Sequence, residues 1–87
     1  MQTNEKLKIM MYNLEDYDIE QYERYRDQYN MKYLKTRLDE STAVFSYGCD
    51  VAVACPMDVI NASVIDELLE CGVKLLAMRS AGYNKES

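Results

Sequence analysis

The chain has 87 residues, 48% of them hydrophobic and 29% charged, and these proportions are those of one small globular domain. Ten basic residues against fifteen acidic ones give a formal net charge of −5, which disfavours nucleic acid and anionic membrane surfaces as partners. The segment from Met1 to Lys8 is too polar for a secretory signal, and no stretch approaches the roughly 18 apolar residues of a membrane span, so we expect a cytoplasmic protein.

The first half of the chain predicts two strands and one helix. Lys6–Tyr12 (KLKIMMY) is an apolar run between polar segments, as expected of a buried strand. Asp16–Tyr29 has apolar residues at three- and four-residue spacing, which predicts an amphipathic helix with Asp16 or Asp18 as its N-cap. Met31–Arg37 (MKYLKTR) mixes apolar and charged residues, which predicts a short strand with one exposed face.

The second half predicts the same alternation again. Leu38–Tyr47 is consistent with a short helix of one to three turns. Asp50–Cys55 (DVAVAC) is apolar on both faces, which is typical of a central parallel strand. Ser63–Cys71 (SVIDELLEC) predicts a helix that Gly72 ends, and Val73–Met78 (VKLLAM) predicts a last strand.

Strands that alternate with helices require a parallel sheet with right-handed crossovers. We therefore predict an α/β fold, a flavodoxin-like three-layer sandwich with a parallel sheet of about four strands. The helical spacing of Tyr22, Tyr25 and Tyr29 indicates a packed face, and the acidic residues between them argue against a platform that stacks nucleic acid bases.

Ligands of open parallel sheets bind beyond the carboxyl ends of the strands, which directs attention to three loops. The loop after Tyr12 holds Glu15, Asp16 and Asp18, the kind of acidic pocket that binds metal in phosphoacceptor receiver domains. That function also needs an aspartate where this chain has Cys55, and the chain has no histidine, so we expect no metal site.

The loop after the central strand places Cys55 between a strand and the start of a predicted helix, where a helix dipole can make a thiol nucleophilic. A thiol phosphatase or a phosphocysteine carrier has this arrangement. However, no glycine-rich loop follows, and Asn61 stands where a phosphate cradle needs arginine. The odd number and the spacing of Cys49, Cys55 and Cys71 fit neither paired disulfides nor a CxxC motif, so we interpret all three as small core residues.

The third loop carries a family resemblance. Arg79–Asn84 (RSAGYN), preceded by VKLLAM, resembles the loop that follows a strand in the D-isomer-specific 2-hydroxyacid dehydrogenases, and its closest likeness is to D-lactate dehydrogenases. Asp50–Cys55, Val59–Gly72 and Lys8–Tyr12 are similar to the family's corresponding strand, helix and opening strand. The resemblance implies that residues 1–87 are the N-terminal part of the substrate (catalytic) domain, incomplete relative to the family domain.

The same resemblance implies an NAD-dependent oxidoreductase that reduces a pyruvate-like 2-oxo acid to a D-2-hydroxy acid. The backbone N–H groups of Ala81 and Gly82 would bind the substrate carboxylate, Cys55 would line the substrate pocket, and Arg79 would be structural or domain-bridging. NAD would be held by a Rossmann domain that this chain does not contain, and no catalytic residue of the family falls within it. We expect a homo-oligomer, a dimer.

Two alternatives stay open. The chain is consistent with a stand-alone, non-catalytic α/β binding or dimerisation module, because a substrate domain without its remaining segments leaves a sheet edge and an apolar face exposed. The second alternative is an enzyme built on a reactive thiol at Cys55.

Overall fold

The computed structural model describes residues 6–79 of the chain. Eight elements follow in order: β1 (Lys8–Met11), α1 (Asp16–Tyr22), the 3₁₀ turn η1 (Glu23–Tyr25), β2 (Asn30–Tyr33), the 3₁₀ turn η2 (Ala43–Ser46), β3 (Val51–Ala54), α2 (Ala62–Cys71) and β4 (Leu75–Met78). The four strands form one parallel sheet in the order β2-β1-β3-β4, so the predicted α/β fold with its parallel sheet is confirmed.

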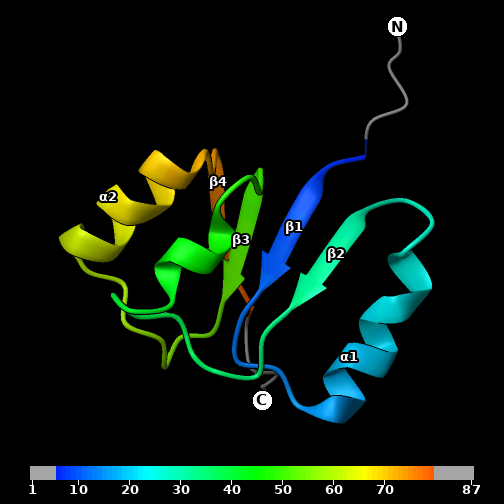
Figure 1. The fold of residues 1–87 in the computed structure, drawn as a ribbon. Coiled ribbons are helices and arrows are strands. Elements are labelled where there is room, and N and C mark those ends of the chain that lie inside the picture. The colour runs from blue at the N-terminus through cyan, green and yellow to red at the C-terminus, as the bar shows by residue number, and fades with distance from the viewer. Residues whose placement is uncertain (1–5, 80–87) are drawn as a thin grey trace, which may run out of the picture.

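Helices cover both faces of this sheet (Figure 1). The helix α1 lies over β1 and β2 on one face, and α2 lies with η2 on the opposite face. Each face has its own core. The larger one joins α2 and η2 to the sheet, and it contains Met10, Tyr12, Leu38, Ala43, Cys49, Ala52, Ala54, Val64, Leu68, Cys71 and Val73.

The smaller core lies under α1 and contains Met11, Leu14 and Met31, with Ile19, Tyr22 and Tyr29 packed against it. The sequence predicted a packed face at Tyr22, Tyr25 and Tyr29. Tyr22 and Tyr29 do pack against this core, whereas Tyr25 is 40% exposed. Along β1 the residues alternate between the two cores, which explains why this strand is apolar on both sides.

The helix predicted over Asp16–Tyr29 is shorter in the structure. It ends at Tyr22 and continues as η1, with hydrogen bonds from Arg26 N to Glu23 O and from Tyr29 N to Tyr25 O. The chain must then return to the start of β1, because Asn30 pairs with Lys8. A strand of four residues is about 13 Å long, whereas a helix of fourteen residues would be about 21 Å long. A helix of fourteen residues would therefore extend beyond the start of β1, where the chain has to begin β2.

The helix predicted over Leu38–Tyr47 is also reduced, to η2. The Asp39 side chain bonds the backbone at the start of this segment. Its Oδ1 accepts hydrogen bonds from Ser41 N (2.9 Å) and Thr42 N (3.1 Å). The Thr42 hydroxyl donates to Arg37 O (2.8 Å). Local side-chain to backbone bonds of this kind compete with helix formation.

The predictions for β3, α2 and β4 are confirmed to within two residues. Asn61 is the N-cap of α2, where its side chain accepts a hydrogen bond from Val64 N (2.9 Å). Gly72 ends the helix with φ 100°, a left-handed conformation that favours glycine.

Among the described residues β4 has a partner strand on one side only, and its Leu75 and Met78 are 57% and 48% exposed. No helix in this part of the chain is long and apolar enough to cross a membrane.

The two leucines at the end of α2 provide a matched test of the larger core. Leu68 is 3% exposed, whereas its neighbour Leu69 is 63% exposed. We expect Leu68→Ala to lower the free energy of unfolding by about 2 to 5 kcal/mol, because it removes buried contacts and leaves a cavity. Leu69→Ala should change it by less than about 0.5 kcal/mol. Urea denaturation of both variants measures this, and equal losses would contradict the assigned core.

Tyr12 makes stability depend on pH in the alkaline range. Its hydroxyl lies 2.6 Å from Ser46 Oγ, the side chain is fully buried, and burial raises its pKa from 10.0 to about 12. The unfolded chain loses this proton first, so the stability conferred by the neutral phenol is complete below pH 10 and declines as the pH rises towards 12. We expect a decline of about 2 to 3 kcal/mol from this group.

Denaturation at pH 9 and at pH 12 measures the decline. Tyr12→Phe should be less stable than wild type at pH 9, because it loses the hydrogen bond to Ser46, and should decline less between the two pH values. Tyr17→Phe is the control, because Tyr17 is 67% exposed. A decline that is identical in wild type and Tyr12→Phe would argue against the buried phenol as its source.

Candidate functional site

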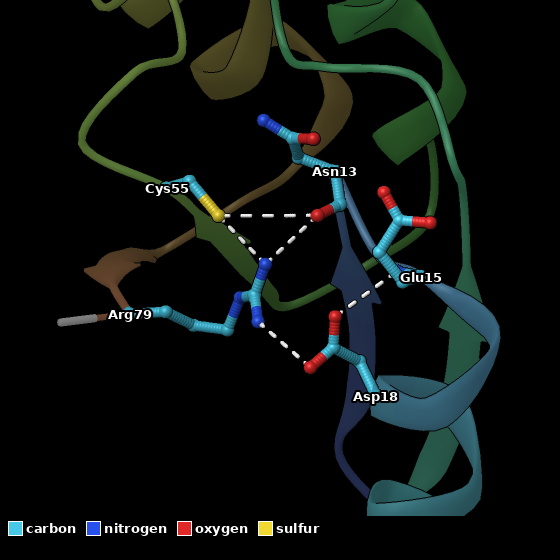
Figure 2. A network of polar contacts seen from close by, with 5 residues as sticks. All are labelled: Asn13, Glu15, Asp18, Cys55 and Arg79. Atoms are coloured by element: carbon cyan, nitrogen blue, oxygen red, sulfur yellow. Dashed lines mark hydrogen bonds and ion pairs between the residues drawn. The ribbon is translucent and has the colours of Figure 1, made fainter. Parts of the chain in front are cut away.

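The candidate site lies at the carboxyl edge of the sheet. Because β1, β3 and β4 are parallel, the residues that follow them meet at one edge. These residues are Tyr12–Glu15 after β1, Cys55–Asp58 after β3 and Arg79 after β4. Figure 2 shows the polar contacts that join them. Ligand sites of open parallel sheets lie beyond this edge.

Asn13 turns the chain sharply as it leaves β1. Its φ of 64° is in the left-handed region, which asparagine tolerates better than most residues. The turn directs the Asn13 N–H to Thr36 O (2.9 Å) and leaves the Asn13 carbonyl facing Cys55 and Arg79 (Figure 2). The backbone of this residue therefore supplies an acceptor to the site.

Asp58 fixes the loop after β3. It is 7% exposed, and its Oδ2 accepts a hydrogen bond from Cys55 N (2.7 Å) while its own N–H donates to Cys55 O (2.9 Å). Its second oxygen, Oδ1, accepts from Asn13 Nδ2 (3.0 Å). One buried carboxylate thus holds the loops after β1 and β3 together.

Arg79 joins the third loop to the other two. Its Nη2 donates to Asn13 O (2.8 Å) and to Cys55 Sγ (2.6 Å), and its backbone N–H donates to Ala54 O (2.7 Å). Nη1 lies 3.7 Å from Asp18 Oδ1. Burial by itself lowers the pKa of this guanidinium, but Cys55, Tyr22 and Asp18 together raise it above its usual value. The contacts fit the structural role expected for Arg79.

Asp18 belongs both to this network and to the start of α1. Its Oδ2 accepts a hydrogen bond from Glu15 N (3.0 Å). This is one of the two reciprocal hydrogen bonds of a capping box in which Glu15 is the N-cap. The prediction of Asp16 or Asp18 as the N-cap is therefore wrong by one and three residues. Asp18 acts instead as the third helical residue, so its carboxylate faces back towards the sheet edge.

The predicted site residues have different outcomes. Cys55 lies at the carboxyl edge, half-buried, and its role in lining a substrate pocket stays a prediction. Its placement at a helix N-terminus is wrong, because α2 begins only at Ala62 after the Asn61 cap. Ala81 and Gly82 lie outside the described residues. Cys49 and Cys71 are buried core residues, as predicted, and Cys55 is not.

The acidic residues after β1 form no metal centre. Asp16 pairs with Lys35 (2.6 Å), and Asp18 faces Arg79. Within residues 6–79 no three histidine, cysteine, aspartate or glutamate side chains come close enough to hold a metal ion.

Sequence reasoning did not identify Asn13 or Asp58. A signal was present for both. Asparagine directly after a buried strand is a common left-handed residue, and Cys-Pro-Met-Asp has an aspartate three residues beyond the strand end, where it can cap a turn. Their contact joins residues 45 positions apart, which no local pattern indicates.

Two relatives of known sequence match nearly the whole chain. A 2-hydroxyacid dehydrogenase homolog from Haemophilus influenzae is 31% identical over 80 residues, and a D-lactate dehydrogenase from Curvularia clavata is 30% identical over 84 residues. Both matches cover 90% of this chain but only 24% of the relative. The chain therefore spans about a quarter of the length of these proteins. No family model matches it.

Solved structures agree with the sequence matches. The apo-structure of the Escherichia coli D-lactate dehydrogenase superposes with a TM-score of 0.80 at 28% identity, covering 90% of this chain and 25% of that one. The pyruvate reductase of Chlamydomonas reinhardtii gives a TM-score of 0.78 at 32% identity, covering 91% and 24%. A D-isomer-specific 2-hydroxyacid dehydrogenase from Lactobacillus delbrueckii, in its NAD-complexed form, gives 0.73 at 26% identity, covering 82% and 23%. The resemblance predicted from the sequence is confirmed, because over nine tenths of its length the chain is similar to D-lactate dehydrogenases and 2-hydroxyacid dehydrogenases.

The buried carboxylate of Asp58 is the contact on which the arrangement of two loops depends. In Asp58→Asn one of the two donors, Cys55 N–H or Asn13 Nδ2, would face an amide NH₂ group instead of an oxygen. We expect a loss of about 1.5 to 3 kcal/mol in the free energy of unfolding, measured by urea denaturation. Asp66→Asn, an exposed substitution on α2, should cost less than about 0.5 kcal/mol. An equally small loss for Asp58→Asn would contradict the tie between the loops.

Proposed function

We infer that this chain, a homologue of the D-isomer-specific 2-hydroxyacid dehydrogenases over nine tenths of its length, is part of an NAD-dependent oxidoreductase that reduces a 2-oxo acid to a D-2-hydroxy acid. The observation that carries the proposal is the match of both sequence and fold to D-lactate dehydrogenases. Pyruvate or a similar 2-oxo acid is the proposed substrate, since one structural neighbour is a pyruvate reductase.

Within such an enzyme, residues 1–87 are the proposed N-terminal part of the substrate domain. The backbone N–H groups of Ala81 and Gly82 are proposed to bind the substrate carboxylate, because residues without bulky side chains let an anion approach the backbone. Cys55 is proposed to line the pocket beside them. Its position at the carboxyl edge, in contact with Arg79 of the last strand end, supports this role.

The cofactor is proposed to lie outside this chain. A relative was solved in an NAD-complexed form, and no glycine-rich dinucleotide fingerprint follows a strand of this sequence. NAD would supply the hydride, and the residues described here would position the 2-oxo acid. The family's acid and base would come from the polypeptide that holds the cofactor.

We also propose a cytoplasmic location and a dimeric enzyme. The cysteines of the described part are free thiols, which suits a reducing compartment.

The open edge of β4 favours a second candidate function, a stand-alone dimerisation module. Leu75 and Met78 of β4 and Ile65 and Leu69 of α2 are all at least 42% exposed, on a strand with one partner among the described residues. An edge of this kind pairs readily with another chain.

The intact mass of the natural gene product separates the two functions. A mass of roughly 35 to 40 kDa is that of two domains of typical size. Such a product should oxidise NADH when pyruvate is added. A product near the 10.1 kDa of this chain would favour the module, and dimerisation by size-exclusion chromatography with light scattering would support it.

A variant of the carboxylate loop tests the site within the enzyme. We expect Gly82→Val to raise the KM for the 2-oxo acid at least tenfold, because the added side chain blocks the approach of the carboxylate to the backbone. Leu69→Ala, on the surface of α2, is the matched control and should leave KM unchanged. An unchanged KM in folded Gly82→Val would remove the proposed role of this loop.

A further inference from the structure

Arg79, the residue that follows β4, is bonded to the ends of two other strands. Its backbone N–H donates to Ala54 O at the end of β3 (2.7 Å). Its side chain extends further, and Nη2 donates to Asn13 O in the loop after β1 (2.8 Å). Because β3 lies between β4 and β1 in the sheet, this side chain crosses the end of β3. Arg79 therefore fixes the end of β4 relative to both neighbouring loops.

The guanidinium of Arg79 faces its own domain. The side chain is 18% exposed, and Nη1 lies 3.7 Å from the Asp18 carboxylate of α1 (Figure 2). Asn13 and Asp18 both come from the start of the chain, more than sixty residues away. An arginine that bridges two domains needs its guanidinium free for the partner domain. Of the two roles expected for Arg79, structural and domain-bridging, these contacts favour a role inside the domain.

The acceptor of the Arg79 side chain is itself held in place. The left-handed turn at Asn13, with φ 64°, sets the direction of its carbonyl group. The N–H of Asn13 donates to Thr36 O (2.9 Å), and its side chain donates to Asp58 Oδ1 (3.0 Å). Asp58 in turn accepts a hydrogen bond from Cys55 N (2.7 Å). Arg79 is thus bonded to two loops that are already joined to each other.

We propose that Arg79 is a positioning residue for the carboxylate loop, residues 80–84, which begins directly after it. By holding the start of this segment against the loops after β1 and β3, Arg79 sets where the N–H groups of Ala81 and Gly82 meet the substrate carboxylate. A binding loop that is positioned before the ligand arrives binds it more tightly, since less order has to be imposed on binding. The inference rests on the proposed function and adds to it a residue that sets the affinity for the 2-oxo acid without touching it.

The test compares the steady-state kinetics of wild type and Arg79→Met in the natural gene product, with NADH and pyruvate as substrates. We expect Arg79→Met to raise the KM for pyruvate about tenfold or more and to leave the KM for NADH unchanged, because only the carboxylate depends on this loop. A purely structural role predicts a different result. Fewer molecules would be folded, so the apparent kcat would fall while the KM for pyruvate stayed the same. That result would overturn the proposal.

Two further variants complete the test. Arg26→Met is the matched control, because Arg26 is 57% exposed and pairs with Glu23, and both KM values should equal those of wild type. Arg79→Lys keeps the positive charge but lacks the planar guanidinium, so the KM for pyruvate should rise about threefold or more. If urea denaturation shows that Arg79→Met is unfolded, Arg79→Lys decides, and a wild-type KM for pyruvate there would overturn the proposal. An equal rise in Arg26→Met would also contradict it.

The proposed function and this inference fail in different ways. If the wild-type gene product does not oxidise NADH with pyruvate or another 2-oxo acid, the proposed function is wrong, and the inference falls with it. If wild type is active and the KM for the 2-oxo acid is unchanged in folded Arg79 variants, the inference alone is wrong.

Discussion

Burial of β1 and β3 on both faces is the constraint on which the rest of the structure depends. In β1, Met10 faces the core under α2 and Met11 faces the core under α1. In β3, Ala52 and Ala54 face the first of these cores and Val53 the second. A polar side chain in place of Met10, Met11 or Ala52 would be buried in an apolar layer, which is costly without a partner. Polar chemistry is therefore confined to the residues where the strands end, which is where Asn13 and Cys55 lie.

This constraint explains which parts of the structure could be predicted. The strand β3 and the helix α2 have strong local signals, a two-sided apolar run and a glycine that ends the helix, and both were predicted to within one residue. The first helix was predicted too long because periodicity does not report how far the chain must travel before it returns beside β1. Topology alone placed Cys55 at the carboxyl edge. The contact between Asn13 and Asp58 could not be predicted, because it depends on the backbone conformations of two separate loops.

The carboxyl edge holds charges of both signs, the Arg79 guanidinium and the carboxylates of Asp18 and Asp58. The net charge is −5, yet the edge holds a guanidinium that is mostly buried, with its side chain 18% exposed. Asp58, the buried carboxylate nearby, accepts two hydrogen bonds, which compensates for its desolvation.

The sheet order has a further consequence for how the chain folds. Residue 8 pairs with residue 30, residue 9 with residue 51, and residue 51 with residue 75, so no two neighbouring strands are joined by a hairpin. Each pairing must close a loop of twenty or more residues before any ladder bond forms, and the entropy of closure precedes the gain. Among the described strands there is therefore no hairpin that could form early and start the sheet. The central strand β1 acquires its second neighbour only when the middle of the sequence has docked, which places the chain among the slower-folding small domains, with its helices as the earliest structure.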